Sequence, residues 1–423
     1  MHEDVTFRDI DLASDVMLQA ATQQRHGAAL LAAAASTIRM FELSSPWARG
    51  MRFVGAEAEC TRMPGVVPIT TRFNLAGSGC ELQDAIASCL GECVERLSQI
   101  EHSGDIVERL SVQDTNIMPS LRELIAQRLA RPGSNTNASL DWMIGRLLGS
   151  DERQLVPADW ILRRAMSGPL FDASTALSTG AAAGRTIVDA SIRGLLELVE
   201  RDAVAQWWLG GSRGRPLRGE DCAAMAATDL LRELRRNSTE RRTWLLDITS
   251  DLDIPVVAAM SVASDGRSFA CGTASRQTMS EAAKSAILEL CQMELGLMLT
   301  RLRLAERGGA GLSEGDRRNL ARSVGFDASR CELLYGVGTA RHPVGVGRDS
   351  NEECLASIID VFARSHIDAV LVDLTRQAFA IPVVRAIAPA LQLMPSDLKT
   401  ARLAAAHARG GGGARWTEGF PLM

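Results

Sequence analysis

Residues 178–202 read Ser178-Thr-Gly180-Ala-Ala-Ala-Gly184-Arg-Thr-Ile-Val-Asp189-Ala-Ser-Ile-Arg-Gly-Leu-Leu-Glu197-Leu-Val-Glu200-Arg201-Asp202. Small residues lead into a helical pattern whose acids stand at Asp189, Glu197 and Glu200. Because an α-helix turns by about 100° per residue, acids placed eight and eleven positions after the first lie at about 80° and about 20° from it. The three carboxylates therefore occupy one stripe of the helix.

The same pattern occurs in two other segments of the chain. It appears as Asp84, Glu92 and Glu95, and again as Glu281, Glu289 and Gln292. A strand-like run precedes each of the three helices, so we expect duplicated strand–helix units. The alternation of strands and long helices predicts an α/β or α+β fold.

The acidic stripes are expected to be partly buried. A single stripe of this kind is typical of a solvated helix face. These helices, however, are apolar around most of their circumference, as the run from Leu195 to Val199 illustrates. Buried carboxylates need cations or hydrogen-bond donors. Such helices converging on one cleft would bind divalent cations, and those cations would bind phosphates.

Glycine residues stand just before all three helices, at Gly77 and Gly79, at Gly180 and Gly184, and at Gly272. A glycine-rich entry to a helix leaves backbone N–H groups free to bind an anion, supported by the helix dipole. The chain has neither a G-x-x-x-x-G-K-[ST] loop nor the protein-kinase motifs. Together these features predict a metal and nucleotide site of an unusual kind.

The composition is that of an ordinary globular protein of 423 residues. Its net charge of −5, from 46 basic and 51 acidic residues, indicates neither a nucleic acid nor an anionic membrane as partner. The N-terminus lacks the basic leader of a signal peptide, and the apolar run 28–35 is far shorter than the roughly 20 residues that span a bilayer. We therefore expect a soluble cytoplasmic protein.

These motifs resemble those of the YcaO family, whose ATP site is built from carboxylates on helices without a Walker loop. The segment 178–184 followed by Glu197-Leu-Val-Glu200-Arg201-Asp202 is similar to the most specific signature of the family. Residues 88–96 resemble its first signature and residues 286–292 its third. The runs 373–375 and 381–389 resemble its closing strands. The resemblance covers about residues 60–400.

The resemblance implies an enzyme that uses ATP and Mg²⁺ to phosphorylate the oxygen of a peptide backbone amide. In azoline-forming members the side chain of the next Cys, Ser or Thr first adds to that amide, and thiazoline or oxazoline results. The thioamide-forming members use external sulfide instead. The chemistry is reasonable because an amide oxygen leaves poorly and a phosphate ester leaves easily. We expect the YcaO component of a synthetase for azole-modified, bacteriocin-like peptides, with thioamide synthesis as the alternative.

The resemblance also assigns residues to the site. The expected Mg²⁺ ligands are Glu92, Glu95, Asp189, Glu197 and Glu200, and the expected catalytic residues are Glu197, Glu200 and Arg201. The residues expected around the nucleotide are Ser88, Glu92, Glu95, Arg185, Asp189, Glu289, Gln292 and Arg385.

Three positions depart from the family pattern. Many members have Asn in place of Arg185, Glu in place of Asp189 and Lys in place of Ser78. These changes raise a further hypothesis, a non-catalytic YcaO-like scaffold subunit that binds nucleotide weakly.

Three regions are expected along the chain. Residues 1–55 are expected to be an Ala-rich helical segment that serves packing or partner contact, because they are too short for a leader-binding module. Residues 56–400 are the expected YcaO catalytic domain. Residues 401–423 are an expected flexible tail, too rich in glycine to hold a helix, which is either disordered or packed against another part of the protein, with reach to the active site. The expected partners are a precursor peptide and a leader-binding protein related to ubiquitin-activating enzymes, with a flavin dehydrogenase or a TfuA-like protein. A dimer or hetero-oligomer is expected.

Overall fold

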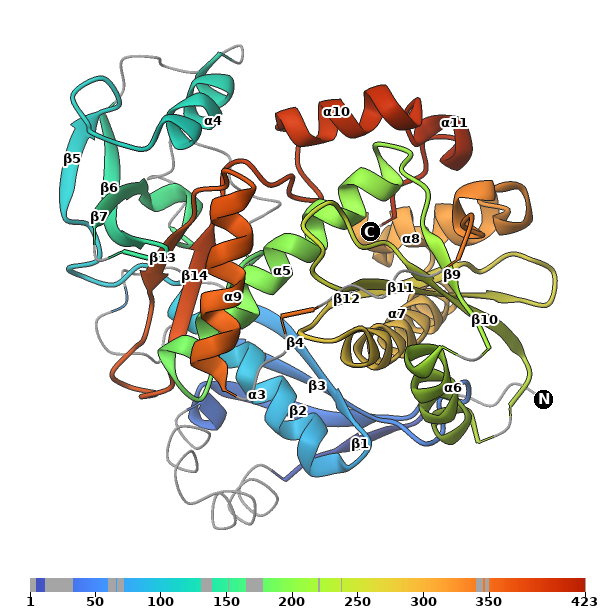
Figure 1. Ribbon diagram of the computed structural model, residues 1–423. Helices are drawn as coiled ribbons and strands as arrows, with labels where there is room; N and C mark the ends of the chain where they lie inside the picture. The colour runs from blue at the N-terminus through green and yellow to red at the C-terminus, as the bar shows by residue number, and fades with distance from the viewer. Residues whose placement is uncertain are drawn as a thin grey trace.

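The computed structural model describes residues 5–11, 33–59, 66, 72–130, 139–150, 152–164, 178–219, 221–236, 238–339, 345–346 and 350–422. Its strands form three sheets, with long helices packed between and against them (Figure 1). This arrangement confirms the predicted α/β or α+β class. No helix of the described ranges is both long and apolar enough to cross a membrane.

The first sheet is antiparallel and four-stranded. In spatial order its strands are β1 (Phe7–Asp9), β2 (Thr37–Leu43), β3 (Arg52–Glu59) and β4 (Arg72–Gly79). The second sheet is also antiparallel, in the order β12 (Ala270–Ser275), β11 (Val256–Ala263), β10 (Arg241–Asp247) and β9 (Arg215–Leu217). The third runs β5 (Glu108–Ser111), β6 (Ser139–Leu147), β13 (Val370–Asp373), β14 (Val383–Ile387) and β8 (Ala181–Ala183), with β7 (Arg153–Pro157) paired to β6.

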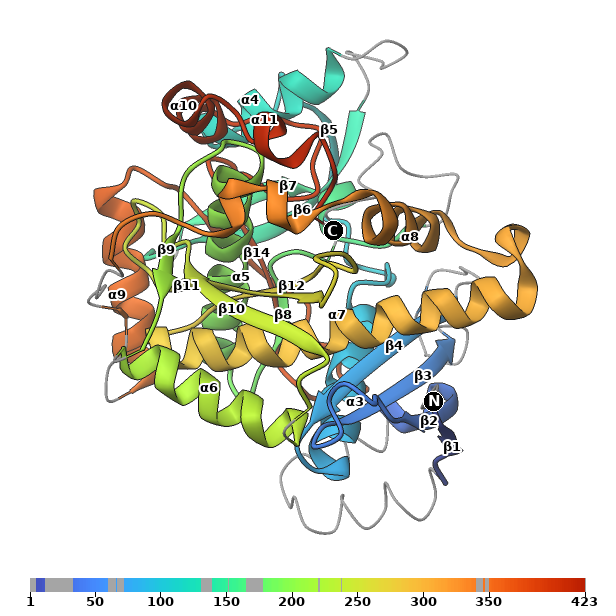
Figure 2. The same cartoon turned by 90° about the vertical axis from the view of Figure 1, so that its right-hand side faces the viewer.

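Three long helices carry the acidic stripes. They are α3 (Leu82–Ser98), α5 (Ile187–Trp208) and α7 (Met279–Arg307). The remaining α-helices are α4 (Pro119–Leu129), α6 (Cys222–Arg235), α8 (Glu314–Gly325), α9 (Asn351–Arg364), α10 (Ala401–Gly410) and α11 (Ala414–Thr417). Figure 2 shows α6 lying alongside the long α7, which it contacts.

The predicted strand–helix units are present in each of the three sheets. Strand β4 leads into α3, β8 into α5 and β12 into α7. Helix α3 packs on β4 and β3, α7 packs on β12 and β11, and α5 packs on β14 and β12. Helix α5 thus lies between the second and third sheets, near the middle of the molecule (Figure 1).

The glycines before the helices mainly allow a strand to pack closely against a helix. Gly77 and Gly272 lie within strands β4 and β12, so the expectation of a glycine-rich entry to the helix is wrong at these two positions. A Cβ atom on Gly272 would lie 2.2 Å from the backbone N of Leu290 in α7. Only glycine lets the strand approach the helix backbone so closely.

The expectation of a helical N-terminal segment is wrong for the described part of residues 1–55. The expected N-terminal helical segment contains β2 and β3, and only residues 33–35 of its described part are helical; residues 1–4 and 12–32 lie outside the described residues. In β2 the buried positions are Thr37, Met40 and Leu43, and the β-branched Thr37 and Ile38 and the aromatic Phe41 favour a strand directly after the Ala-rich stretch.

The expected flexible tail is also folded. Helix α10 begins after Thr400, whose side chain accepts a hydrogen bond from the Leu403 N–H at 3.4 Å, and ends at Gly411 with φ 74°. The glycine run therefore terminates a helix instead of preventing one. The tail packs against the C-terminal end of α5, where Trp208 Nε1 donates to the Phe420 carbonyl at 2.9 Å.

Candidate functional site

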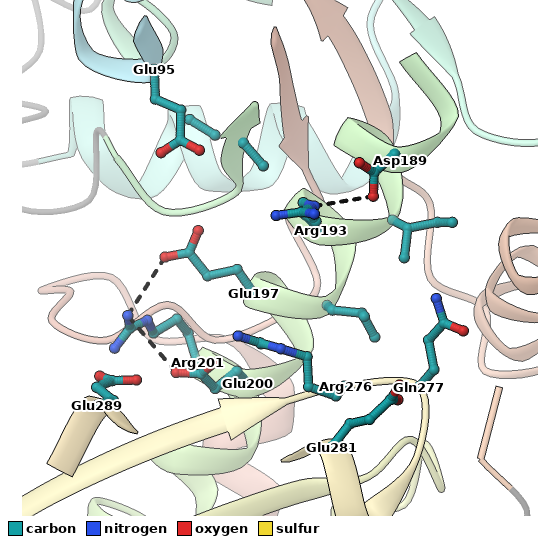
Figure 3. A pocket seen from close by; sticks show the side chains of 14 residues that line it. Glu95, Asp189, Arg193, Glu197, Glu200, Arg201, Arg276, Gln277, Glu281 and Glu289 are labelled. Carbon is teal, nitrogen blue, oxygen red and sulfur yellow. Dashed lines mark hydrogen bonds and ion pairs between the residues drawn. The ribbon is translucent and has the colours of Figure 1, made fainter. Parts of the chain in front are cut away.

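A cavity of about 440 Å³ lies where the three acidic helices meet. Figure 3 shows its charged side chains pointing inward from α5, α7, the end of α3 and the loop before α7. The acidic residues in its lining are Glu95, Asp189, Glu197, Glu200, Glu281 and Glu289. The basic residues are Arg193, Arg201 and Arg276. With all of these groups ionised, the acids outnumber the arginines by two to one.

Two carboxylates on one side of the cavity accept backbone N–H groups from the segment around β8. Glu95 Oε1 accepts from Ala183 at 2.8 Å and Glu197 Oε2 accepts from Gly180 at 2.9 Å. Burial raises the pKa of the Glu95 carboxyl to about 7, and nearby Glu197 and Glu92 add to that effect. Burial also raises the pKa of Glu197. These N–H groups orient both carboxylates without supplying a full positive charge.

Arg201 lies between the two signature glutamates of α5. Its Nη2 is 3.5 Å from Glu197 Oε1 and 3.8 Å from Glu200 Oε1. Glu200 is held by Thr273 Oγ1, which donates at 2.8 Å, and by the Ser275 N–H at 3.2 Å. Strand β12 therefore positions Glu200, and Glu200 in turn positions Arg201.

Glu289 approaches the same cluster from α7. Burial raises the pKa of its carboxyl to about 8, and the negative charge of Glu200 contributes further. Burial is the main cause of these raised pKa values, and the arginines of the cavity do not offset it, so added positive charge would favour the ionised carboxylates. A bound cation would supply that charge.

The leading acid of each acidic stripe occupies the N3 position of its helix. The Thr186 side chain accepts a hydrogen bond from the Asp189 N–H, and Asp189 Oδ2 accepts from the Arg185 N–H at 2.9 Å. In α7, Thr278 and Glu281 form a complete capping box. Asp189 and Glu281 thus cap their helices while lining the cavity, and the signature T-x-x-[DE] in the sequence could have shown this role.

Several expected nucleotide residues do not line the cavity. Ser88 and Arg185 are exposed to solvent. Glu92 accepts the Ala76 N–H at 2.8 Å and pairs with Arg96 at 2.7 Å. Gln292 donates to the hydroxyl of Ser78, the position where many family members have Lys.

Arg385 is buried in β14, next to the cavity wall. Burial lowers the pKa of its guanidinium to about 10, partly offset by the charge of Glu197. Its Nη2 donates to the Trp160 carbonyl at 3.4 Å. It acts on Glu197 through its charge.

Four polar lining residues were absent from the expected site: Arg193, Arg276, Gln277 and Glu281. Arg193 stands one helical turn after Asp189, and its Nε donates to Asp189 Oδ1 at 3.1 Å. That spacing was visible in the sequence. Arg276 precedes the capping box of α7, and nothing in its local sequence indicates that it faces the acids of α5.

The carboxylate oxygens of the cavity suit Mg²⁺ that is bound together with phosphates. Across the described residues, no three His, Cys, Asp or Glu side chains form a ready-made metal cluster. Mg²⁺ is usually held by one or two carboxylates plus substrate phosphates and water, so a preassembled cage is not needed. Glu95, Glu197 and Glu200 offer the oxygen ligands that this ion prefers.

The fold is shared with solved structures of known proteins. A heterocyclase in complex with substrate and cofactor superposes with a TM-score of 0.72 at 19% identity, over 96% of this chain and 56% of the other. The structure of YcaO from Methanopyrus kandleri bound with AMPPCP and Mg²⁺ gives 0.62 at 20% identity, over 88% and 91%. The Escherichia coli microcin synthetase McbBCD complex gives 0.60 at 15% identity, over 84% and 88%.

Sequence comparison extends the likeness. An uncharacterized protein from Methanothermobacter thermautotrophicus is 29% identical over 196 residues, which are 44% of this chain and 47% of that protein. The chain thus spans about half the length of this curated relative. The model of the YcaO cyclodehydratase family, described as ATP- and Mg²⁺-binding, matches residues 76–392. The chain therefore belongs to the YcaO family, whose ATP and Mg²⁺ are the cofactors that the sequence predicted.

Proposed function

We propose that this chain is an ATP- and Mg²⁺-dependent cyclodehydratase that forms thiazolines or oxazolines from Cys, Ser or Thr in a ribosomally made peptide. The observation that carries the proposal is the convergence of Glu95, Glu197, Glu200, Arg201 and Glu289 on one cavity between the repeat helices. Membership of the YcaO family supports it. A carboxylate-rich cavity that lacks positive charge is suited to nucleotide phosphates accompanied by cations.

The proposed reaction moves one amide oxygen from the peptide to phosphate. The thiol or hydroxyl loses its proton, and its sulfur or oxygen bonds to the carbon of the preceding amide. The former amide oxygen takes the γ-phosphoryl group of ATP, and ADP leaves. The carbon–oxygen bond then breaks with phosphate as leaving group, while the nitrogen loses its proton and a C=N bond forms. The peptide loses one molecule of water for each ring that forms.

The residues of the cavity have separate proposed roles. Arg201 places a fixed guanidinium beside the transferred phosphoryl group, where it stabilises the charge that develops there. Glu95, Glu197 and Glu200, together with Asp189, would hold Mg²⁺ through their carboxylate oxygens. The metal, when bound, neutralises phosphate charge. The N–H groups of Gly180 and Ala183 keep Glu197 and Glu95 oriented.

We propose that the enzyme works in a complex. A leader-binding subunit related to ubiquitin-activating enzymes would present the peptide, and a flavin dehydrogenase would oxidise azolines to azoles. One structure of similar fold is of a microcin synthetase complex bound to its precursor, which makes such an assembly reasonable. A TfuA-like partner would instead indicate thioamide synthesis.

Intact-mass measurement tests the proposal. The chain, its partner subunits and precursor peptide are incubated with ATP and Mg²⁺, and omission of ATP serves as control. Loss of water from the peptide, one for each ring, is the expected result. A gain in mass through exchange of oxygen for sulfur would identify a thioamide synthetase. No change in mass, together with no ATP turnover, would support the scaffold hypothesis and refute catalysis.

A further inference from the structure

Two glycine-rich segments interlock at the C-terminal end of α5, far along the helix from its signature glutamates. They are residues 210–214 and residues 410–413. The Gly413 N–H donates to the Leu209 carbonyl at 2.8 Å. A Cβ atom on Gly413 would lie 1.6 Å from the Trp208 carbonyl oxygen, and one on Gly410 would lie 2.5 Å from the Gly210 carbonyl oxygen. Only glycine allows this backbone-to-backbone contact.

Beside the interlock lies a second cavity, of about 260 Å³, whose lining includes three arginine side chains. Arg213 and Arg215 come from the first glycine-rich segment and strand β9, and Arg409 comes from α10. This cavity shares no lining residue with the acidic cavity. Its single acidic lining residue, Asp251, is bound by Arg402 through two hydrogen bonds of 2.6 and 3.0 Å. The cavity therefore has an excess of positive charge.

Arg213 is held in position by Glu332, whose Oε2 lies 3.5 Å from Arg213 Nη1, whereas Arg215 and Arg409 are available to a ligand. Arg213 Nη2 donates to the Glu332 carbonyl at 3.2 Å, and the guanidinium lies 5.1 Å from the centre of the Trp416 ring. Neither the Arg215 nor the Arg409 guanidinium makes a hydrogen bond or close ion pair with another described residue, and the charge of Arg409 acts on Asp251 from a longer distance. Two arginines therefore keep their N–H groups for a ligand.

Hydroxyl groups complete this set of donors. Thr249 Oγ1 accepts the Val256 N–H at 3.1 Å, and Ser250 Oγ accepts the Leu252 N–H at 3.3 Å. Both oxygens act as acceptors in these bonds, so their O–H protons remain available. Ser212 adds a third hydroxyl to the lining.

We infer that this cavity binds the phosphate group of a small ligand, at a site separate from the ATP site. Guanidinium groups bind phosphate oxygens through paired, charge-assisted hydrogen bonds, and hydroxyls can donate to the remaining oxygens. The cavity is smaller than the roughly 300–1,000 Å³ of pockets that enclose a drug-sized ligand. It therefore accommodates the phosphate end of a ligand, or free phosphate or pyrophosphate.

Hydrogen–deuterium exchange of the full chain tests this inference, because it measures the protection of each segment separately from that of the ATP site. Inorganic phosphate and pyrophosphate are titrated in turn, and exchange is followed in residues 209–217 and 404–418. We expect the amides of both segments to exchange more slowly as ligand is added. Comparing phosphate with pyrophosphate shows whether one phosphate group is enough for binding. Absence of protection in these segments with both ligands would overturn the inference.

Matched variants test the role of the arginines. Arg215→Gln combined with Arg409→Gln is expected to raise the ligand concentration needed for protection at least about tenfold, since two charge-assisted contacts are lost. The Lys pair at the same positions keeps the charge but loses the paired geometry, so it is expected to be intermediate. Arg232→Gln, at an exposed arginine of α6, is the control for net charge. Equal protection in the double Gln variant and the control would contradict the proposal.

Discussion

Arg402 and Asp202 form an ion pair that joins the C-terminal helix α10 to the signature helix α5. Arg402 Nη2 is 2.8 Å from Asp202 Oδ2, and the Asp202 side chain is fully buried. Asp202 also accepts the Gln392 N–H at 2.9 Å and the Gln206 side-chain amide at 2.7 Å. Since Asp202 directly follows Glu200 and Arg201, this pair fixes the helix behind the acidic cavity.

Arg402→Gln should destabilise the protein, because it leaves a buried carboxylate without its cation. Loss of one partner of a buried pair costs about 3–5 kcal/mol, and the two remaining hydrogen bonds of Asp202 place the expected loss at about 3 kcal/mol. Urea denaturation measures this change. In the double variant Asp202→Asn/Arg402→Gln no charge is buried, so its stability should lie closer to wild type. A double variant less stable than Arg402→Gln alone would contradict this explanation.

Glu197→Gln and Glu200→Gln should each reduce ATP turnover by about 100-fold or more, since each removes a charge at the proposed metal site. Peptide-dependent phosphate release measures turnover, and circular dichroism checks the fold. Glu200→Gln should also lower the free energy of unfolding by about 1–2 kcal/mol. Thr273 and the Ser275 N–H both donate to the Glu200 carboxylate, and in the variant one of them would face an amide NH₂ in place of an acceptor oxygen. Glu306→Gln, at an exposed position of α7, is the control. Wild-type turnover in both variants would refute the metal role.

Arg276→Gln should raise the KM for ATP by about tenfold with a smaller change in kcat, because the side chain lines the cavity from the loop before α7. Arg276→Lys should recover part of the affinity. Steady-state kinetics at varied ATP concentration separate the two constants. An unchanged KM in the Gln variant would remove Arg276 from nucleotide binding.

Without nucleotide and Mg²⁺, the free energy of unfolding should fall as pH rises from about 5 to about 8. The folded-state pKa values of Glu95 and Glu289 are raised from 4.5 to about 7 and about 8. A raised folded-state pKa means that the folded protein binds protons that the unfolded chain releases, so stability is present at low pH and lost above it.

Melting temperatures across this pH range measure the effect. Glu95→Gln should make the dependence shallower, because it removes one of the titrating groups. Mg²⁺ with an ATP analogue should stabilise the protein more at pH 8 than at pH 5, because the metal competes with protons for the same carboxylates. A stability that rises steadily over this range in the metal-free protein would contradict the prediction.

Gly272→Ala should destabilise the protein strongly, by about 3 kcal/mol or more, because its Cβ would lie 2.2 Å from the Leu290 backbone N. Gly296 is a matched control in α7, because nothing lies within 4 Å of a Cβ placed there. Gly296→Ala should therefore stabilise the helix by about 0.5–1 kcal/mol. Thermal denaturation of both variants compares them. A neutral Gly272→Ala would refute the close-packing explanation.

Local sequence patterns predicted much of the fold and part of the candidate site. The strand-like runs and the hydrophobic period predicted strand–helix units, and α3, α5 and α7 each follow a strand. The stripes on α5 and α7 predicted that Glu197, Glu200 and Glu289 share a cleft, and all three line the acidic cavity. Both kinds of prediction depend on periodicity within one element, which a sequence displays directly.

The periodicity of a single element does not predict contacts between segments that are far apart in the sequence. Arg276 faces the carboxylates of α5 only because β12 and the loop after it lie beside that helix. The glycine content of the tail predicted flexibility. In the structure the same glycines allow the tail to pack closely against residues 210–214. A glycine has the same local preference in a loose tail and in a close contact, so only the partner segment distinguishes them.

The sequence by itself determined the three amphipathic helices, the strand that precedes each one and the acids that share a face, because hydrophobic period and capping residues are local properties. The tertiary structure alone decided which acids meet in one cavity, which arginines balance them and where the tail lies. Those outcomes depend on sheet pairing and helix packing between residues far apart in the chain, and that pairing is set by the burial of the whole core.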